Sequence, residues 1–217
     1  MFRQFTLWDI FYQLLVATQW TVYLSAVAFL GGALFGFGFM LLRVVPFRPA
    51  NWAARSYIQF IQGTPLLMQL FLVFFGLSIF GLNVSAWAAA AIALIAFTSA
   101  FLAEIWRGCV QSVPLPQWEA SAALGLGWLQ QLRYVILPQA VRIAIPPTVG
   151  FSVQVIKSTS LASIIGFIEL TRAGTALNNV TFRPFVVFLF VAILYFSLCY
   201  PLTVWSRLLE RKLNVSR

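Results

Sequence analysis

The chain is poor in charge, and poorest in acidic charge. Only 9% of its 217 residues are charged, five of them acidic and fourteen basic. Soluble domains carry roughly 25% charged residues, so most of this chain cannot face water. Histidine is absent, and the two cysteines, Cys109 and Cys199, form no CxxC pair. We therefore predict two free thiols and no metal site.

What the chain has instead is apolar sequence, at 61% hydrophobic residues. Its length favours a single domain. The net charge of +9 would suit a nucleic-acid partner, but the basic residues stand singly or in small groups beside apolar runs. That distribution is typical of membrane topology signals. We predict a lipid bilayer as the environment and no nucleic acid as a partner.

Uncharged runs predict five membrane spans, near residues 20–42, 57–80, 86–103, 143–156 and 184–206. The first run has 23 uncharged residues. It is longer than the core of a signal peptide, about 7–15 residues, and suits a bilayer core about 30 Å thick. The fourth run is short and contains two adjacent prolines, so we expect a kinked or partly re-entrant helix there.

Residues 1–19 precede the first span and carry apolar side chains at helical spacing. We expect an amphipathic helix that lies on the outer membrane surface; the alternative is an extension of the first span. Within that span, Gly32 and Gly36 are four residues apart. Such a pair of glycines would let another helix approach closely.

The basic residues divide unequally between the two sides of a protein with five spans. With a cytoplasmic C-terminus, ten lysines and arginines lie inside and four lie outside, so the positive-inside rule favours an outside N-terminus. The inside set is Arg43, Arg48, Arg55, Arg107, Arg133, Arg142, Arg207, Arg211, Lys212 and Arg217, and the outside set is Arg3, Lys157, Arg172 and Arg183. This orientation places the loop 107–142 in the cytoplasm.

Residues 114–138 of that loop are too polar to span a membrane and too apolar for a solvated linker. An exposed apolar segment usually marks an interaction site. Pro114 suits the start of a helix, and Glu119 then falls in the first turn, where a carboxylate complements the helix dipole. Gly125 and Gly127 can end the helix with positive φ. The residues predict a short helix that is presented to a cytoplasmic partner.

This loop resembles the EAA loop of ABC importer permeases, in which EAA is followed by three residues, a glycine, nine residues and I-x-L-P. Here Glu119-Ala120-Ser121, Gly125 and Val135-Ile136-Leu137-Pro138 stand at matching spacings, and Leu124 would be an apolar knob. The resemblance implies a coupling helix that docks on an ATP-hydrolysing subunit, with a charged contact from Glu119 and a turn at Gly125. Leu137-Pro138 would mark the boundary before the chain re-enters the membrane.

No Walker A sequence occurs in the chain, so ATP and its Mg are expected on a partner chain. This subunit is therefore expected to be non-catalytic, with no cofactor of its own.

Three further segments, residues 57–71, 101–113 and 157–170, resemble polar amino acid permeases of the histidine/glutamine type. The resemblance implies an all-α membrane protein with the MetI-like, type I ABC importer fold. It implies five transmembrane helices plus an N-terminal interfacial helix and a cytoplasmic coupling helix, with residues 20–217 as the transmembrane domain.

The same resemblance implies import of a polar amino acid across a bacterial inner membrane by alternating access. The expected partners are a homologous permease subunit, two ATP-binding subunits and an extracytoplasmic substrate-binding protein. The alternatives are a related permease for another solute, such as an opine or an organic cation, and a secondary transporter. A secondary transporter would normally show intramembrane acids and an inverted repeat.

Gln59 and Gln62 depart from the family pattern, which commonly has Glu and Arg at these positions. A charge deep in a bilayer costs about 2.5–3.5 kcal/mol by insertion scales, whereas an amide pair could keep a hydrogen bond without the charges. Either this subunit is half of a heterodimer whose partner keeps the charges, or a structural pair has drifted to neutrality.

Polar residues at membrane depth are candidates for a substrate path, because lipid rejects them. They are Gln59, Gln62, Thr64, Gln69, Gln154, Lys157, Thr159 and Ser160. Hydrogen bonding between helices is the alternative for each. Glu104 and Arg107 are three residues apart and are expected to pair on a helix surface. Glu169, Arg172 and Arg183 fall on an outer loop, where they receive a binding protein or are simply solvated.

Overall fold

The computed structural model describes residues 5–214, and all regular elements in that range are helical. The α-helices are α1 (Leu7–Val44), α2 (Arg48–Gly63), α3 (Leu66–Phe71), α4 (Leu77–Ile79), α5 (Ala86–Gln111), α6 (Leu115–Ala123), α7 (Trp128–Gln130), α8 (Leu137–Ser158), α9 (Leu170–Thr181) and α10 (Pro184–Asn214). π-Helical segments cover Leu72–Gly76 and Gln131–Ile136, and a 3-10 helix covers Thr159–Ser163.

By length and composition, four helical stretches can cross a membrane, and a bent pair of helices can supply a fifth span. The four are Leu7–Val44, Ala86–Gln111, Trp128–Ser163 and Pro184–Leu213. The prediction of an all-helical membrane protein is confirmed. The predicted number of five spans holds when the bent pair counts as one of them.

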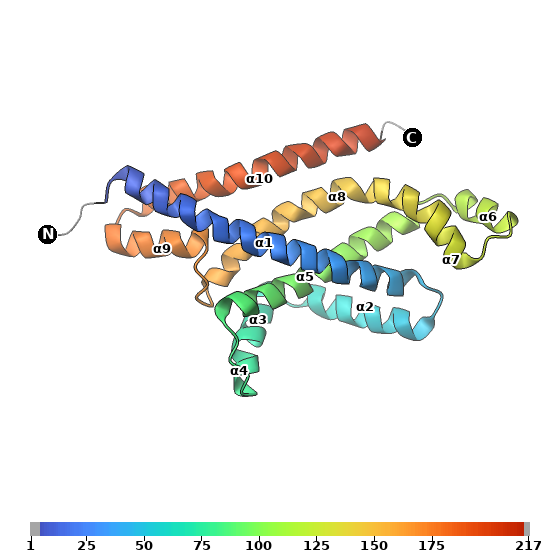
Figure 1. Ribbon diagram of the computed structural model, residues 1–217, viewed down its shortest axis with the longest axis horizontal. Coiled ribbons are helices and arrows are strands. Elements are labelled where there is room, and N and C mark those ends of the chain that lie inside the picture. The colour runs from blue at the N-terminus through green and yellow to red at the C-terminus, as the bar shows by residue number, and fades with distance from the viewer. Residues whose placement is uncertain (1–4, 215–217) are drawn as a thin grey trace.

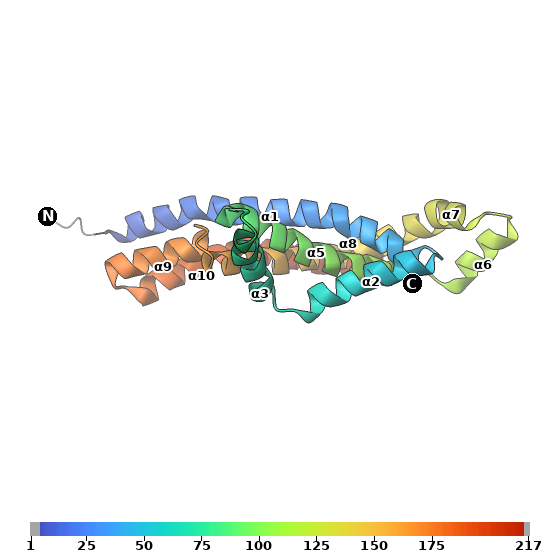
Figure 2. The same cartoon turned by 90° about the horizontal axis from the view of Figure 1, so that it is seen from below.

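The molecule is elongated, and α1, α5, α8 and α10 run along its long axis (Figure 1). Helices α6 and α7 lie at one end of the molecule, and α9 lies at the opposite end. Helices α2 and α3 extend to one side of the bundle (Figure 2). The fold therefore separates a projecting helical hairpin at one end from the α9 cap at the other.

Helix α1 is continuous from Leu7 to Val44, so the expected separate interfacial helix at residues 1–19 is wrong for the described part of that segment. A capping box starts the helix: the Thr6 hydroxyl accepts from the Asp9 amide at 3.2 Å, and the Asp9 carboxylate accepts from the Thr6 amide at 3.0 Å. Ile10 and Leu14 are fully buried in an apolar cluster with α9 and α10. The segment continues the helix of the first span, and α9 and α10 cover the side of it that bears Ile10 and Leu14.

Gly32 and Gly36 lie where α1 packs against α5, as their spacing predicted. A Cβ built at Gly32 would be 2.4 Å from two carbons of Thr98, and one at Gly36 would be 2.9 Å from the Ser99 carbonyl oxygen. Real Cβ atoms do not come this close to other heavy atoms. Glycine therefore sets the distance between the two helices.

The predicted span 57–80 is not one straight helix, because the chain bends by 103° between α2 and the α3–α4 segment. Proline disfavours the helical conformation of the residue before it, and Thr64, before Pro65, is extended with φ −114° and ψ 139°. The Gln69 amide braces the corner by donating to the Ile61 carbonyl at 2.8 Å and the Thr64 carbonyl at 3.1 Å.

The fourth span is longer than the predicted 143–156 and is neither short nor re-entrant. Helical structure continues from Trp128 to Ser163, and Pro146 and Pro147 lie inside α8 without ending it. Each proline removes the hydrogen bond that its own nitrogen would donate, and its ring crowds the carbonyl four residues before it, but the helix continues through both. The helices continue beyond the predicted span ends 103 and 206, since α5 runs to Gln111 and α10 to Asn214.

Candidate functional site

Helix α6 (Leu115–Ala123) projects from one end of the bundle and follows directly after α5 (Figure 1). Pro114 occupies the N-cap position, and a second proline lies in the first turn. Prolines suit these positions because the first amides of a helix have no intrahelical partner. Glu119 lies in the second turn, so its expected place in the first turn is wrong; the helix begins one residue after Pro114.

A hydrogen-bonded turn at Gly125 ends α6. Gly125 has φ +76°, its amide donates to the Ala122 carbonyl at 2.9 Å, and the Leu126 amide donates to the Ser121 carbonyl at 3.3 Å. These two bonds form a Schellman motif, which requires a left-handed residue at the position of Gly125. Positive φ is confirmed at Gly125 and wrong at Gly127, where φ is −66°.

Two glutamines hold the chain after that turn. The side-chain amide of Gln131 donates to the Leu126 carbonyl at 2.6 Å. The side-chain oxygen of Gln130 accepts from the backbone N–H of Gly127 at 3.0 Å. The turn is thus fixed to the helical segment that begins at Trp128, and α6 has a defined direction relative to that segment.

The tip of this hairpin is apolar and open. Leu124 is 80% exposed, Leu129 is 68% exposed and Leu115 is 66% exposed. Glu119 and Ala120 are exposed as well. Exposed apolar residues gathered on one projecting element mark an interaction surface rather than a solvated loop.

The opposite side of the hairpin packs on the protein. Ser121 is 2% exposed, and its hydroxyl donates to the Trp118 carbonyl at 2.8 Å. Trp118 packs against a cluster that contains Leu132 and Ile136. Among the predicted coupling residues, Ser121 is therefore buried on the inner side of the hairpin. Leu137 is half-buried and Pro138 exposed, and they lie where the π-helical segment passes into α8 without a break.

A charged cluster ties the base of the hairpin to the bundle. Arg107 contacts Glu104 at 2.6 Å, as their spacing predicted, and Arg43 of α1 contacts the other carboxylate oxygen at 3.2 Å. Arg43 also donates to the Asn51 side chain at 2.7 Å. The cluster joins α1, α2 and α5 a few residues before α6 begins. The sequence did not predict Arg43, because 61 positions separate it from Glu104.

The predicted substrate-path residues fall into two groups, one at the bend between α2 and α3 and one at the end of α8. Gln59, Gln62, Gln154 and Lys157 are exposed, Thr64 and Ser160 are half-buried, and Gln69 and Thr159 are buried. Both groups border one apolar cluster, which contains Leu70 of α3 and Val155 of α8.

The expected Gln59–Gln62 amide pair is wrong for the described chain. The Gln62 amide donates instead to the Ala100 carbonyl at 3.4 Å. The two glutamines are three residues apart on α2, but Gln62 turns toward α5.

Glu169 is fully buried, so its expected position on an exposed outer loop is wrong. It caps α9, with its carboxylate accepting from the Thr171 and Arg172 amides at 2.9 Å and from the Tyr195 hydroxyl at 2.8 Å. The Thr21 hydroxyl of α1 is a longer contact at 3.4 Å. Glu169 thereby joins α1, α9 and α10. Arg172 is exposed on α9 and Arg183 follows it, also exposed.

Burial raises the pKa of Glu169 above its ordinary 4.5, and the hydrogen bonds it accepts oppose part of that rise. A carboxyl group with a raised pKa contributes stability below its unfolded pKa and loses that contribution as pH rises through the folded pKa. We expect the melting temperature of the purified protein to fall as pH increases from 4.5, and Glu169→Gln to flatten this dependence.

The control is Glu210→Gln, which neutralises an exposed acid on α10. Thermal unfolding in one detergent across pH 4.5–7.5 measures the difference. Equal slopes for the wild type and Glu169→Gln would contradict the assignment.

A bundle of candidate membrane spans with an open, braced helix at one end is the architecture of a membrane-embedded subunit that docks on another chain. The family model described as "Binding-protein-dependent transport system inner membrane component" matches residues 11–215. The chain belongs to this family: it is a multi-pass inner-membrane permease subunit of an ABC transporter, in complex with ATPase subunits. Such permease subunits are non-catalytic and carry no cofactor.

Relatives of known name agree with this membership. The chain is 33% identical over 217 residues to the probable glutamine ABC transporter permease protein GlnM of Bacillus subtilis, covering 100% of this chain and 97% of the relative. A crystal structure of an amino acid ABC transporter with histidines matches with a TM-score of 0.88 and 34% identity, over 92% of this chain and 94% of that chain.

The methionine ABC transporter MetNI, in an inward-facing conformation, matches with a TM-score of 0.78 and 20% identity, over 92% of this chain and 96% of that chain. This match confirms the MetI-like fold.

Proposed function

We propose that this subunit imports a polar amino acid by alternating access, with glutamine as the first substrate to test. Support comes from the relatives, since GlnM is named for glutamine and matches over the whole of this chain. The solved structure at 34% identity is named for an amino acid transporter. The segments at residues 57–71 and 157–170 resemble the same group of permeases.

The observation that carries the proposal is α6, the projecting tip of the hairpin, where Leu115 at its start, Glu119 and Leu124 at its end are exposed. The turn at Gly125 fixes the end of this helix. We propose that this tip docks in the ATPase subunit, with Glu119 making a charged contact. Because the base of α6 packs in a cluster shared by α1, α2, α5 and α8, movement of the ATPase would move these spans together.

We propose that the end bearing α6 faces the cytoplasm, with the N-terminus outside. Support comes from the charges, since Arg133, Arg142, Arg207, Arg211 and Lys212 belong to elements at this end, while Arg172 and Arg183 lie beside α9 at the other. The full assembly has two ATP-binding subunits, a second permease subunit, either another copy or a homologous chain, and an extracytoplasmic binding protein.

We propose that the exposed polar residues of α2 and α8, Gln59, Gln62, Gln154 and Lys157, line the substrate path together with Thr64, Gln69, Thr159 and Ser160. Their exposure on the single chain leaves them available to substrate or to the second permease subunit. Gln69 acts indirectly, because its amide holds the corner at Thr64.

The test is ATP-dependent uptake by proteoliposomes that contain this chain, its ATPase subunits and its binding protein. We expect uptake of labelled glutamine that excess polar amino acid suppresses. Uptake of octopine or choline in place of glutamine would overturn the substrate class, and uptake driven by a proton gradient without ATP would overturn the mechanism. Full activity with this chain as the sole permease would exclude an obligate heterodimer.

A further inference from the structure

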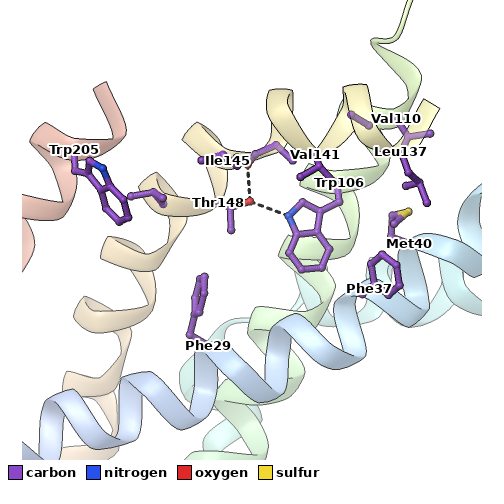
Figure 3. Close-up of a pocket in the computed structure, with 13 residues that line it drawn as sticks. Phe29, Phe37, Met40, Trp106, Val110, Leu137, Val141, Ile145, Thr148 and Trp205 are labelled. Carbon is purple, nitrogen blue, oxygen red and sulfur yellow. Dashed lines mark hydrogen bonds between the residues drawn. The ribbon is translucent and has the colours of Figure 1, made fainter. Parts of the chain in front are cut away.

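An apolar groove lies between the spans, away from both groups of predicted substrate-path residues. It has a cavity volume of about 490 Å³, and its walls come from α1, α5, α8 and α10. Figure 3 shows Phe29 and Phe37 on α1 facing Trp106 of α5 and Ile145 of α8, with Trp205 on α10 at one edge. All four wall helices belong to stretches long and apolar enough to cross a membrane. The groove therefore lies in the membrane-spanning part of the chain.

Inside this groove, the two polar side-chain groups of Trp106 and Thr148 are paired with each other, and the Trp205 indole N–H lies at one edge. The Thr148 hydroxyl accepts from the Trp106 indole N–H at 2.8 Å and donates to the Ala144 carbonyl at 2.6 Å, as the dashed lines in Figure 3 mark. A polar ligand would lose its hydrogen bonds to water, and a single indole N–H at the edge would not replace them. The groove thus excludes a zwitterionic amino acid and suits a hydrocarbon chain.

Cations lie at the end of the groove where α8 begins and α10 ends. Arg142 is one helical turn before Ile145 and two turns before Val149, both of which line the groove. Lys212 is two turns after Trp205 and so lies on the same face of α10. Both cations are exposed, and neither makes an ion pair within the described residues. Glu210 lies near them, but the stretch 207–212 holds three cations and one acid.

We propose that the groove binds one acyl chain of an anionic phospholipid whose phosphate is held by Arg142 and Lys212. Basic pockets between transmembrane helices are suited to anionic headgroups, and the apolar walls supply the complementary site for the chain. A second copy of this protein is a poorer occupant, because a symmetric contact would bring two surfaces with the same basic residues together.

The acyl-chain part is tested by filling the groove with Ala144→Trp. The matched control is Ala26→Trp, which places the same new side chain at an exposed alanine of the spanning helix α1. We expect native mass spectrometry of the full chain, purified in mild detergent with added phosphatidylglycerol, to show one retained lipid per chain in the wild type and in the control. Retention should fall about tenfold in Ala144→Trp, which corresponds to about 1.4 kcal/mol.

The headgroup part is tested with the double variant Arg142→Gln, Lys212→Gln. Its control is the double variant Arg172→Gln, Arg183→Gln, which removes two exposed cations near α9. A basic residue near a membrane contributes about 1 kcal/mol to anionic lipid binding, so we expect retention to fall about twentyfold or more in the first variant and to stay unchanged in the control. Phosphatidylcholine should be retained far less than phosphatidylglycerol.

Three results would overturn the proposal. The first is equal phosphatidylglycerol retention by Ala144→Trp and Ala26→Trp. The second is equal retention of phosphatidylglycerol and phosphatidylcholine. The third is loss of permease–permease association in Ala144→Trp alone, which would make the groove a contact between chains.

Discussion

Substitution of Gly125 by valine is expected to reduce ATP-driven uptake about tenfold or more while the protein still inserts in the membrane. Gly125 has φ +76°, a conformation that costs other residues roughly 1–2 kcal/mol and costs β-branched residues more. The strain would break the turn that orients the α6 tip. A bundle with typical stability of about 5–15 kcal/mol survives a local change of this size, so the loss should appear in coupling and not in folding.

Gly127→Ala is the matched control, because Gly127 has φ −66° and the new Cβ would meet only the Gln130 side chain, at an ordinary 3.7 Å. Uptake and ATP hydrolysis are measured side by side in proteoliposomes. Wild-type uptake by a normally inserted Gly125→Val variant would contradict the role of the turn.

Glu119→Ala tests the charged contact at the same tip. A hydrogen bond to a charged group contributes about 1.5–3 kcal/mol, so losing it should weaken docking of the ATPase by about tenfold or more. Glu119 makes no ion pair within the described residues, and its removal should leave the melting temperature unchanged. Glu210→Ala, at an exposed acid of α10, is the control. Equal pull-down of the ATPase by the Glu119 and Glu210 variants would exclude the contact.

Gly32→Ala is expected to be strongly destabilising, although it adds a single methyl group. The new Cβ would lie 2.4 Å from Thr98, which is itself fully buried. Overpacking of this kind costs about 1–3 kcal/mol, which is roughly 2–12 °C in melting temperature for a chain of this size. Since α5 leads into α6, uptake should fall with stability.

Gly38→Ala provides the comparison on the same helix, because no atom lies within 4 Å of a Cβ at that position. Its melting temperature should be unchanged or slightly higher, since alanine favours helix more than glycine does. Equal melting temperatures for the Gly32 and Gly38 variants would show that α1 and α5 are less closely packed than the structure has them.

The features that the residues predicted correctly are local ones. The start of α6 at Pro114 and the positive φ of Gly125 at its end follow from the preferences of single residues. The Glu104–Arg107 pair follows from a spacing of three on one helix. Each of these needs no information about distant segments.

The largest errors of burial concern features that depend on distant neighbours. The N-terminal segment appeared suited to a membrane surface, but α9 and α10 cover Ile10 and Leu14. Glu169 appeared to belong to a solvated loop, yet Thr21 and Tyr195 surround it from α1 and α10. Burial is a property of the assembled bundle, and charge gaps along the chain do not encode it.

The sequence by itself determined that this protein is a membrane protein, that its spans are helical, and that a short exposed helix lies near Glu119. Hydrophobic runs and the preferences of proline and glycine act over a few residues, and the chain carries them before it folds. Only the tertiary structure decided which face of that helix is free, which charges hold its base, and where the spans leave an apolar groove. Those features arise from packing between helices that are far apart in the chain.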